Sequence, residues 1–434
     1  MDRTLASTPV ADSKTKPPLL FLTQRIPYPL IKGEKIRHFH TIRYLKERFD
    51  LYIGGLVDDA EDWQYLPKIN ELARDTHFAK LDPRLAKLSC MRGLFSGQPL
   101  SFTYFDNREL HRWIDRVLRQ VRPAVCFISS SNMAPYAIDH EERPPYVIMD
   151  FIDVDSEKWA AYATEAHWPM SWVYRREHQR VSEAERHIAG IADVATFVSD
   201  AEADMFRKLF PPAAGKTFGV ANGVDSEYFS PDATRPPPYE TGPATFVFTG
   251  SMDYPPNVQA VCFFAEKVLP EVRSSVDGAR FFIVGARPAP AVAALSELDG
   301  VTVTGRVLDV RPYLDHATAT AAPMFIARGI QNKVLEAMAM AKPVIATWQA
   351  LEGIELDTAR EVVVANSADE FISASIAAAR GETDPGIGDR ARQRVVENYS
   401  WAARLSGFDR FLDRIGEAAS NGKTPYMGTH HSPD

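Results

Sequence analysis

The sequence predicts an α/β protein built from two doubly wound domains. Three observations predict this fold class: a length of 434 residues, an alternation of short apolar runs with longer helical patterns, and a proline-rich break near the middle of the chain. A chain of this length exceeds one ordinary hydrophobic core and suits two domains of Rossmann size. Its content of 45% hydrophobic and 24% charged residues is typical of a globular protein.

Short apolar runs rich in β-branched and aromatic residues recur along the chain, and we expect them to form strands. Because the runs are continuous rather than alternating, they suit strands buried on both faces of a parallel sheet. In the first half the predicted strands span residues 19–23, 51–57, 124–128, 146–151, 194–198 and 218–221. In the second half they span residues 245–249, 280–284, 301–304, 318–322, 344–347 and 361–364.

The segments between the strands show helical spacing of apolar residues and are predicted to be helices. The main ones span residues 34–48, 108–121, 172–188, 258–272 and 330–340. Strand–helix alternation of this kind is typical of doubly wound domains. Ligands of such sheets bind at the carboxyl ends of the strands, so two domains in tandem predict a site where these ends face each other.

The domain boundary is predicted from composition. Prolines gather over residues 231–243, which form a semi-rigid linker in this interpretation. We therefore expect a first domain over residues 17–230 and a second over residues 244–398. The tails, residues 1–16 and 418–434, are rich in small and polar residues and are expected to be disordered.

Charge and cysteine content exclude several classes of function. A net charge of −8 argues against a nucleic-acid partner, which requires a basic excess. The three cysteines and the histidines lack the spacing of a metal site, and the cysteines suit buried reduced thiols. The polar start of the chain is unlike a signal peptide, and no apolar run is long enough to cross a bilayer. These features predict a cytoplasmic protein without a metal.

The first candidate site lies between a predicted strand and the helix that follows it. Residues 318–322 form the strand, a loop passes through Arg328 and Gly329, and the helix begins near Ile330. The N-terminus of a helix presents backbone N–H groups and a positive dipole end, which favour phosphate. Arg328 adds positive charge, and Gly329 allows close approach of the backbone. This loop is predicted to bind a phosphate group.

Two charged residues of the same helix extend this prediction. Lys333 lies one turn into the helix and supplies a second cation, while Glu336 lies deeper and offers a carboxylate to ribose hydroxyls. The alternative is that Lys333 and Glu336 form an ordinary surface pair three residues apart.

The second candidate site is the loop after the first predicted strand, residues 27–37. Gly33 precedes the first helix, and Lys32, Lys35 and Arg37 supply positive charge. We expect Gly33, Lys35 and Arg37 to contact phosphates. The alternative is a solvated loop with ordinary surface lysines. The glycine fingerprints of dinucleotide-binding and P-loop proteins are absent here.

The third candidate site follows the strand at residues 146–151. Asp150, Asp153 and Asp155 come within six positions, and a carboxylate at a strand end can orient a sugar hydroxyl or take a proton. Asp155 and Ser156 are equally suited to cap the following helix. Asp153 is therefore the predicted functional carboxylate.

Two turns complete the predicted sites. Asn222 starts an Asn-Gly turn at the end of the first half, for which a simple turn is the alternative. Gly250 and Ser251 follow the first strand of the second half and are expected to lie beside a diphosphate.

These segments resemble a known family in their order along the chain. Residues 222–231 resemble the Asn-Gly-Val-Asp…Phe…Pro signature that ends the first domain of the family-4 retaining glycosyltransferases. The match runs from about residue 19 to residue 411. Second-domain strand ends and the donor helix of that family resemble residues 248–250, 282–285, 303–305 and 334–339.

A narrower resemblance concerns three segments of the chain. Residues 27–37, 153–156 and 328–333 are similar to sugar transferases of the PEP-CTERM/exosortase exopolysaccharide loci of Gram-negative bacteria. This resemblance implies a place in exopolysaccharide biosynthesis. The same resemblance implies an undecaprenyl-linked or other saccharide acceptor at the inner face of the cytoplasmic membrane. It also implies peripheral contact of the protein with that membrane.

The family resemblance implies a GT-B fold and a specific chemistry. It implies transfer of a hexose from a nucleoside diphosphate sugar, such as a UDP- or GDP-sugar, with retention of anomeric configuration and without a metal or a tightly bound cofactor. It also implies that a helix at residues 399–417 crosses back to the first domain.

The chain departs from the family pattern at three positions. The first glutamate of the family's Glu-x7-Glu motif is replaced by Arg328, while the second is kept as Glu336. The family's Gly-Arg…Lys pair, which holds the diphosphate after the first strand of the second domain, is absent, since Gly250 is followed by Ser251, Met252 and Asp253. The family's first-domain histidine has no match, and Asp153 is our substitute. Arg328 and Lys333 are therefore expected to carry the phosphate charge.

Two other functions remain open from the sequence. A sugar-nucleotide 2-epimerase has the same fold and would convert its substrate without an acceptor. A degenerate, non-catalytic scaffold in a polysaccharide-assembly complex is suggested by Arg328 at the position of the family's glutamate.

Overall fold

The computed structural model describes residues 16–413, apart from residues 31–32, 95–96, 241, 243 and 328. The expected disordered tails fall outside these residues except for Lys16, and so does the end of the helix predicted at 399–417. The chain divides into two compact units, which we describe separately: residues 1–222 with 405–434, and residues 223–404.

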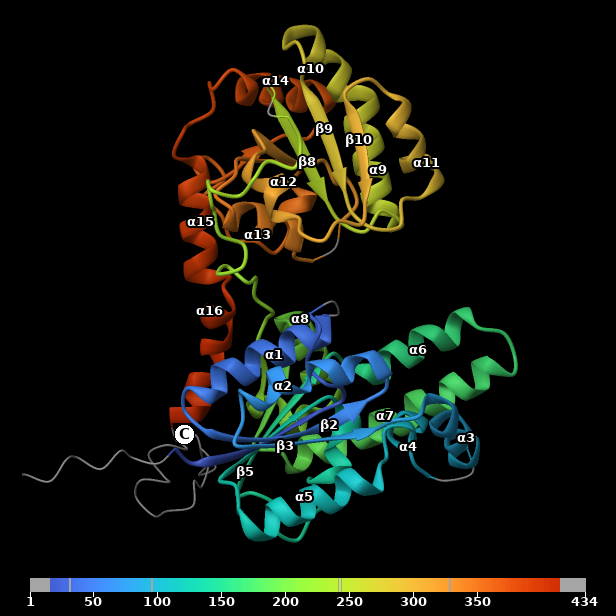
Figure 1. The fold of residues 1–434 in the computed structure, drawn as a ribbon. Coiled ribbons are helices and arrows are strands. Elements are labelled where there is room, and N and C mark those ends of the chain that lie inside the picture. The colour runs from blue at the N-terminus through green and yellow to red at the C-terminus, as the bar shows by residue number, and fades with distance from the viewer. Residues whose placement is uncertain are drawn as a thin grey trace, which may run out of the picture. The chain divides into compact units, whose positions relative to one another are not determined.

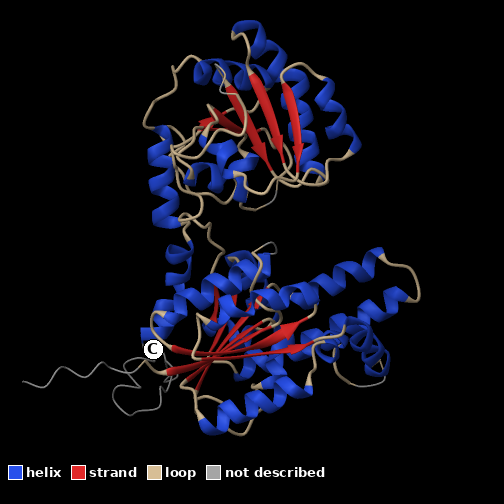
Figure 2. Cartoon of the chain, viewed as in Figure 1, coloured by secondary structure: helices blue, strands red, loops and turns tan. Residues whose placement is uncertain are grey.

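The first unit is built around a parallel sheet, which the described residues form from seven strands. Its order is β3-β2-β1-β4-β5-β6-β7, so the chain winds outward in both directions from the boundary between β1 and β4 (Figures 1 and 2). Most of these strands are buried on both faces, which explains their continuous apolar sequences. The strands are β1 (Pro18–Thr23), β2 (Asp50–Val57), β3 (Asp75–Lys80), β4 (Val125–Ser129), β5 (Tyr146–Ile152), β6 (Val194–Phe197) and β7 (Thr217–Gly219).

Helices cover both faces of this sheet, with α1 and α2 on one side and α5 on the other (Figure 1). The start of α5 is capped by Asn107, whose side chain accepts hydrogen bonds from the N–H groups of Glu109 and Leu110. The helices are α1 (Gly33–Lys46), α2 (Leu66–Asn70), α3 (Pro83–Gly93), α4 (Leu100–Tyr104), α5 (Arg108–Gln120), α6 (Asp155–Glu165), α7 (Met170–Ile191) and α8 (Asp200–Leu209).

Residues 405–413, from the far end of the chain, also belong to the first unit. Phe408 is fully buried and its ring meets that of Phe127 in β4, with centroids 5.4 Å apart. The hydroxyl of Tyr44 in α1 donates a hydrogen bond to Asp409. Buried aromatic and apolar side chains therefore attach this segment to the sheet and to α1.

The second unit contains a parallel sheet whose six strands lie among the described residues. Its order is β10-β9-β8-β11-β12-β13, with the reversal between β8 and β11. This second doubly wound sheet confirms the predicted fold class. The strands are β8 (Thr245–Thr249), β9 (Arg280–Val284), β10 (Val301–Gly305), β11 (Ala319–Ala322), β12 (Val344–Ala346) and β13 (Val363–Val364).

The helices of the second unit pack their apolar faces against this sheet. The helix predicted at 258–272 is in fact three pieces, with a π-helical turn at Phe264–Val268 between α9 and α10. The helices are α9 (Pro255–Phe263), α10 (Leu269–Ser275), α11 (Pro290–Ala294), α12 (Arg311–Asp315), α13 (Asn332–Ala339), α14 (Ala368–Ala379), α15 (Ile387–Asn398) and α16 (Trp401–Leu405), the last of which ends across the unit boundary.

Two further elements differ from the sequence prediction. Strand β3 was not predicted. Among the described strands it pairs with β2 alone, and its sequence, Asp-Thr-His-Phe-Ala-Lys, mixes polar and apolar residues as an edge strand does. Helix α13 begins at Asn332 and not at Ile330, which lies in the preceding loop.

Candidate functional site

The strand order of the second sheet marks where its ligand site belongs. Ligands of doubly wound sheets bind beyond the carboxyl ends of the strands where the order reverses. Here those strands are β8 and β11. Gly250 and Ser251 follow β8, and the chain leaves β11 for the start of α13. The predicted phosphate-binding segments therefore lie at the expected edge.

The loop after β8 is held by unusually close backbone packing. The N–H of Gly250 donates to the carbonyl of Val284, and a Cβ atom added at Gly285 would lie only 1.6 Å from the Gly250 carbonyl oxygen. A Cβ atom at Gly250 would come within 2.8 Å of the Asn257 amide. Gly285 leaves no room for a Cβ atom against the backbone of Gly250, and a side chain at Gly250 would displace the Asn257 amide.

Lys333 reaches from α13 to the end of β8. Its ammonium donates a hydrogen bond of 2.8 Å to Oδ1 of Asn257, lies 3.3 Å from the sulfur of Met324, and sits 5.1 Å from the centre of the Phe248 ring. Among the described residues no carboxylate forms an ion pair with Lys333. Burial lowers the pKa of Lys333 to about 8. A half-buried cation whose described hydrogen-bond and ring contacts are all neutral favours an anionic ligand.

Glu336 lies one turn deeper in α13 and is also partly buried. Burial raises the pKa of its carboxyl group to about 7, and the nearby charge of Lys333 opposes that rise. No hydrogen bond reaches this carboxylate from the described residues. Glu336 and Lys333 are therefore not the solvated surface pair of the alternative interpretation.

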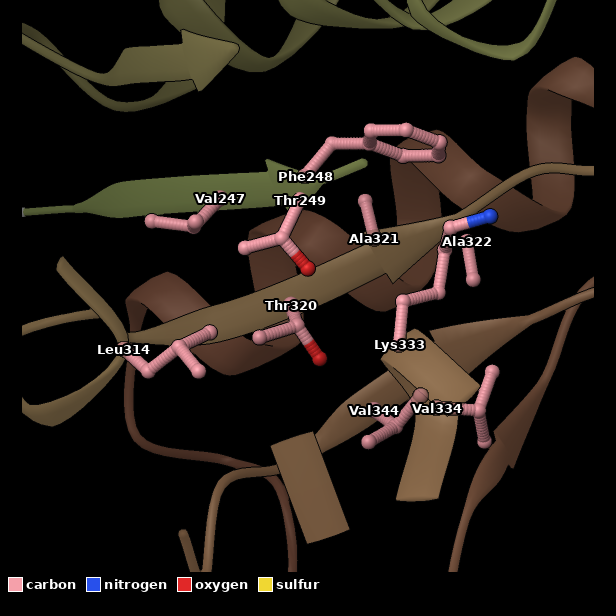
Figure 3. A pocket seen from close by; sticks show the side chains of 10 residues that line it. All are labelled: Val247, Phe248, Thr249, Leu314, Thr320, Ala321, Ala322, Lys333, Val334 and Val344. Atoms are coloured by element: carbon pink, nitrogen blue, oxygen red, sulfur yellow. The ribbon is translucent and has the colours of Figure 1, made fainter. Parts of the chain in front are cut away.

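A narrow cavity opens beside Lys333, between β8, β11 and α13 (Figure 3). Its volume is about 10 Å³, enough for a single water molecule. Thr249 and Thr320 contribute hydroxyl groups, and the remaining walls are aliphatic or aromatic. This space is too small for a sugar, so a donor would lie outside it, over the strand ends.

The loop before α13 is described only in part. Arg328, predicted to share the phosphate charge, lies outside the described residues. Gly329 adopts a φ of 66°, a left-handed conformation that glycine tolerates, and a Cβ atom there would meet nothing within 4 Å. Gln331 occupies the N-cap position of α13, but its side chain donates to the carbonyl of Gly329, so the described residues provide no side-chain cap for the first N–H groups of the helix.

The first sheet has a corresponding edge at β1 and β4, and the predicted cations near it have protein partners. Lys35 is 3% exposed; its ammonium lies 2.5 Å from Asp62 and donates to the carbonyl of Tyr28. Gly33, by contrast, begins α1 with open space around it. Lys35 therefore anchors the loop between β1 and α1, and a direct phosphate contact by Gly33 or Lys35 stays a prediction.

Arg37 lies at the centre of an extensive polar network in the first unit. Its guanidinium donates two hydrogen bonds of 2.8 and 2.9 Å to Asp150 and others to the carbonyl of Val220 and to Oδ1 of Asn222. Arg37 and Asp150 are each 1% exposed. The structure thus brings two predicted residues, Arg37 and Asn222, together in a buried network; their contact with a ligand stays a prediction.

Asp153 lies beside strained backbone at the end of β5. Ile152 has a φ of 74° and Ser130, after the neighbouring β4, has a φ of 76°. A β-branched residue rarely adopts this conformation, which costs on the order of 1–3 kcal/mol and often occurs at functional sites. The Asp153 carboxylate is partly exposed and pairs with Lys158 at 2.7 Å. Asp153 is thus available to a ligand, and its role stays a prediction.

The capping interpretation of Asp155 and Ser156 was wrong. Val154 occupies the N-cap position of α6, without a side-chain cap. Ser156 instead donates a hydrogen bond of 2.6 Å to Glu185 in α7. Burial raises the pKa of the Glu185 carboxyl group to about 7.

Two residues of these sites were missed from the sequence. Asn257 links Lys333 to the Ser251 carbonyl, and nothing in the pattern around it distinguishes it from an ordinary helix residue. Glu185 had a signal, because it falls with Glu177, Val181 and Ile188 on one face of α7. An acid inside an apolar stripe is a recognisable anomaly.

Two features are absent from the described residues. No helix there combines the length and apolar character needed to span a bilayer. No group of histidine, cysteine and acidic side chains there has an arrangement suited to a metal ion.

Comparison with known proteins relates both the sequence and the fold to glycosyltransferases. Residues 243–380 match the family described as glycosyl transferases group 1. A curated relative is the GDP-mannose-dependent alpha-(1-6)-phosphatidylinositol monomannoside mannosyltransferase of Mycobacterium tuberculosis. It is 29% identical over 277 residues, which cover 58% of this chain and 68% of the relative.

Solved structures share the fold along almost the whole chain. A glycosyltransferase from Rickettsia africae matches with a TM-score of 0.57 at 13% identity, covering 94% of this chain and 99% of that one. Sucrose-phosphate synthase from Thermosynechococcus elongatus matches with a TM-score of 0.55 at 15% identity, covering 93% and 100%. Anabaena Alr3699/HepE in complex with UDP matches with a TM-score of 0.54 at 13% identity, covering 91% and 99%. These likenesses confirm the predicted GT-B fold.

Proposed function

We propose that the chain, which has the GT-B fold, is a nucleotide-sugar-dependent glycosyltransferase of group 1 and that its donor binds at the β8–α13 edge of the second unit. The sugar then passes to a saccharide or lipid-linked acceptor with retention of configuration. The observation that carries the donor site is Lys333, a half-buried cation without a carboxylate partner among the described residues.

The proposed mechanism rests on the charge that develops on the leaving nucleoside diphosphate. As the glycosidic bond breaks, negative charge collects on the β-phosphate, and preorganised positive groups lower the energy of that state. Lys333 and the N-terminus of α13 are proposed to supply these groups, together with Arg328, Gly329 and Ile330, which precede the helix in the sequence. Gly250 and Ser251 line the other side of the phosphates.

Glu336 is proposed to hold the ribose. Its carboxylate lies beyond Lys333 along α13 and lacks a hydrogen bond from the described residues, so ribose hydroxyls would satisfy it. Hydrogen bonds to the charged form would lower its raised pKa. In the first unit, Asp153 is proposed to orient the sugar or acceptor, and Gly33, Lys35, Arg37 and Asn222 to shape the edge that receives them.

The donor and pathway are proposed from the relatives. The mycobacterial relative is named as GDP-mannose-dependent and acts on a phosphatidylinositol mannoside, which supports a GDP-sugar and a lipid-linked acceptor. The resemblance of residues 27–37, 153–156 and 328–333 to PEP-CTERM-associated transferases supports a role in exopolysaccharide biosynthesis. We place the protein in the cytoplasm, with its acceptor at the membrane.

A thermal-shift screen tests the donor site. A ligand that binds only the folded state raises the melting temperature, so UDP-, GDP- and ADP-sugars are compared, with GDP-mannose first. We expect one donor to raise the melting temperature of the wild type and not that of Lys333→Ala. The matched control is Lys267→Ala, which removes an exposed lysine of the same unit. An equal shift in the wild type and Lys333→Ala would contradict the assignment.

A further inference from the structure

Helices α6 and α7 of the first unit form a hairpin that extends away from the sheet (Figure 1). We call residues 159–174, where the two helices meet, the hairpin tip. Rings of Trp159, Tyr162 and Tyr174 form a cluster between the helices, with centroids 5.6–6.0 Å apart. The tip is thus an ordered structure and not a frayed loop.

The hairpin tip exposes large apolar side chains in unusual density. Trp168 is 82% exposed, and Trp172, Tyr162 and Met170 are each between 44% and 53% exposed. Single apolar side chains scattered on a surface need no explanation, but several large ones exposed within one short hairpin suggest an interaction site.

The charge of the hairpin tip differs from that of the whole chain. The tip contains one acid, Glu165, and neither lysine nor arginine, whereas 24% of the chain is charged and its net charge is −8. Arg175 follows directly and is exposed. An otherwise acidic protein therefore presents here a surface from which acids are nearly absent.

Helix α3 adds a second apolar and basic surface at the same end of the unit (Figure 1). Leu85 is 64% exposed and Leu88 is 53% exposed, and the basic side chains of Arg84 and Lys87 lie beside them. Arg176 of α7 donates hydrogen bonds to the carbonyls of residues 93 and 98. This contact ties the end of α3 to the hairpin.

We propose that the hairpin tip and α3 together dock on the surface of an anionic phospholipid bilayer. Tryptophan and tyrosine favour the interface between headgroups and acyl chains, and peripheral binding combines buried apolar area with attraction of cations to anionic lipid. Trp168, Met170 and Trp172 enter the interface, while Arg84 and Lys87 contact lipid phosphates. The low acid content of the tip removes the repulsion that the rest of the chain would experience.

Vesicle co-sedimentation of the full chain, without donor, tests this proposal independently of the donor site. Vesicles of phosphatidylcholine alone are compared with vesicles that also contain phosphatidylglycerol. We expect the wild type to bind the anionic vesicles and Trp168→Ser/Trp172→Ser to bind about tenfold less. The matched control is Trp348→Ser, which removes a tryptophan that is 54% exposed in the second unit and should leave binding unchanged.

Two further measurements identify the kind of contact. Arg84→Gln/Lys87→Gln should weaken binding to anionic vesicles about tenfold and reduce its dependence on salt. Brominated lipid should quench the tryptophan fluorescence of the wild type and quench that of Trp168→Ser/Trp172→Ser less. Equal vesicle binding by the wild type and the tip variant would overturn the proposal. So would a tip variant that changes only the oligomeric state in light scattering, since the tip would then contact a second copy.

Discussion

The two sheets carry similar cations at corresponding edges, and the cations have different partners. Lys35 and Arg37 at the first sheet are buried in ion pairs with Asp62 and Asp150. Lys333 at the second sheet meets the amide of Asn257. A buried charge with a carboxylate partner holds structure together, whereas one with neutral partners is poised for an anion. The partner of a cation therefore indicates its role better than its place in a motif.

The largest effect should come from breaking the structural pair of the first unit. Arg37→Ala leaves Asp150 buried without its partner, which costs about 3–5 kcal/mol of the free energy of unfolding. Urea denaturation measures this loss. If Arg37 served mainly to bind phosphate, the variant would keep wild-type stability and lose activity. The cations at the two sheets would then not differ in role.

Lys333→Ala should have the opposite profile. Removing this cation takes away charge that stabilises the leaving diphosphate, so transfer should fall about tenfold or more while the fold survives. Steady-state rates and the far-ultraviolet circular dichroism spectrum measure the two properties together. Near-normal turnover in Lys333→Ala, with Lys267→Ala as the reference, would remove Lys333 from the site.

The pH dependence of donor binding sharpens the same assignment. The pKa of Lys333 is lowered to about 8, so its charge disappears as the pH rises above 8. A diphosphate binds the charged form, and the dissociation constant should therefore rise by about fivefold to tenfold for each pH unit above 8. Calorimetric titration measures it. Lys333→Arg keeps its charge at these pH values, so the rise should vanish in that variant.

Glu336→Gln should have the smallest effect of the four. The amide still accepts a hydrogen bond, so we expect donor affinity to fall about fivefold, which corresponds to about 1 kcal/mol. A 2′,3′-dideoxy nucleotide provides the check. The wild type should lose affinity for this analogue, and Glu336→Gln should lose much less; equal losses would show that Glu336 does not contact the ribose.

Much of the fold could be predicted from the sequence because buried parallel strands have continuous apolar sequences, which are easily recognised. Strand β3 was missed because its single neighbour leaves it partly exposed and its sequence correspondingly mixed. The first turn of the predicted α13 was wrong because Ile330 belongs to the loop that carries Gly329. The local pattern of apolar residues predicts strands and helices reliably where they are fully buried. It predicts them less well at the edge of a sheet or in a loop that binds a ligand.

The site was less predictable, for a reason that the first unit makes clear. The sequence places Lys35, Arg37 and Lys333 near strand ends, but it does not show that Asp62 and Asp150 fold back onto the first two. In the first pairing the two residues are separated by 27 positions in the sequence, and in the second by 113 positions. Asn257 was missed for the same reason, since its link to Lys333 crosses 76 positions. Long-range contacts decide these roles, and no local spacing encodes them.

The return of residues 405–413 to the first unit bears on how the protein is made. Leu405, Phe408, Phe411 and Leu412 are each no more than 4% exposed, and burial of each such side chain contributes about 1.5–3 kcal/mol. These side chains leave the ribosome only after the whole second unit. The core of the first unit therefore stays incomplete during most of translation. The second unit can fold before the last apolar residues of the first unit have been synthesised.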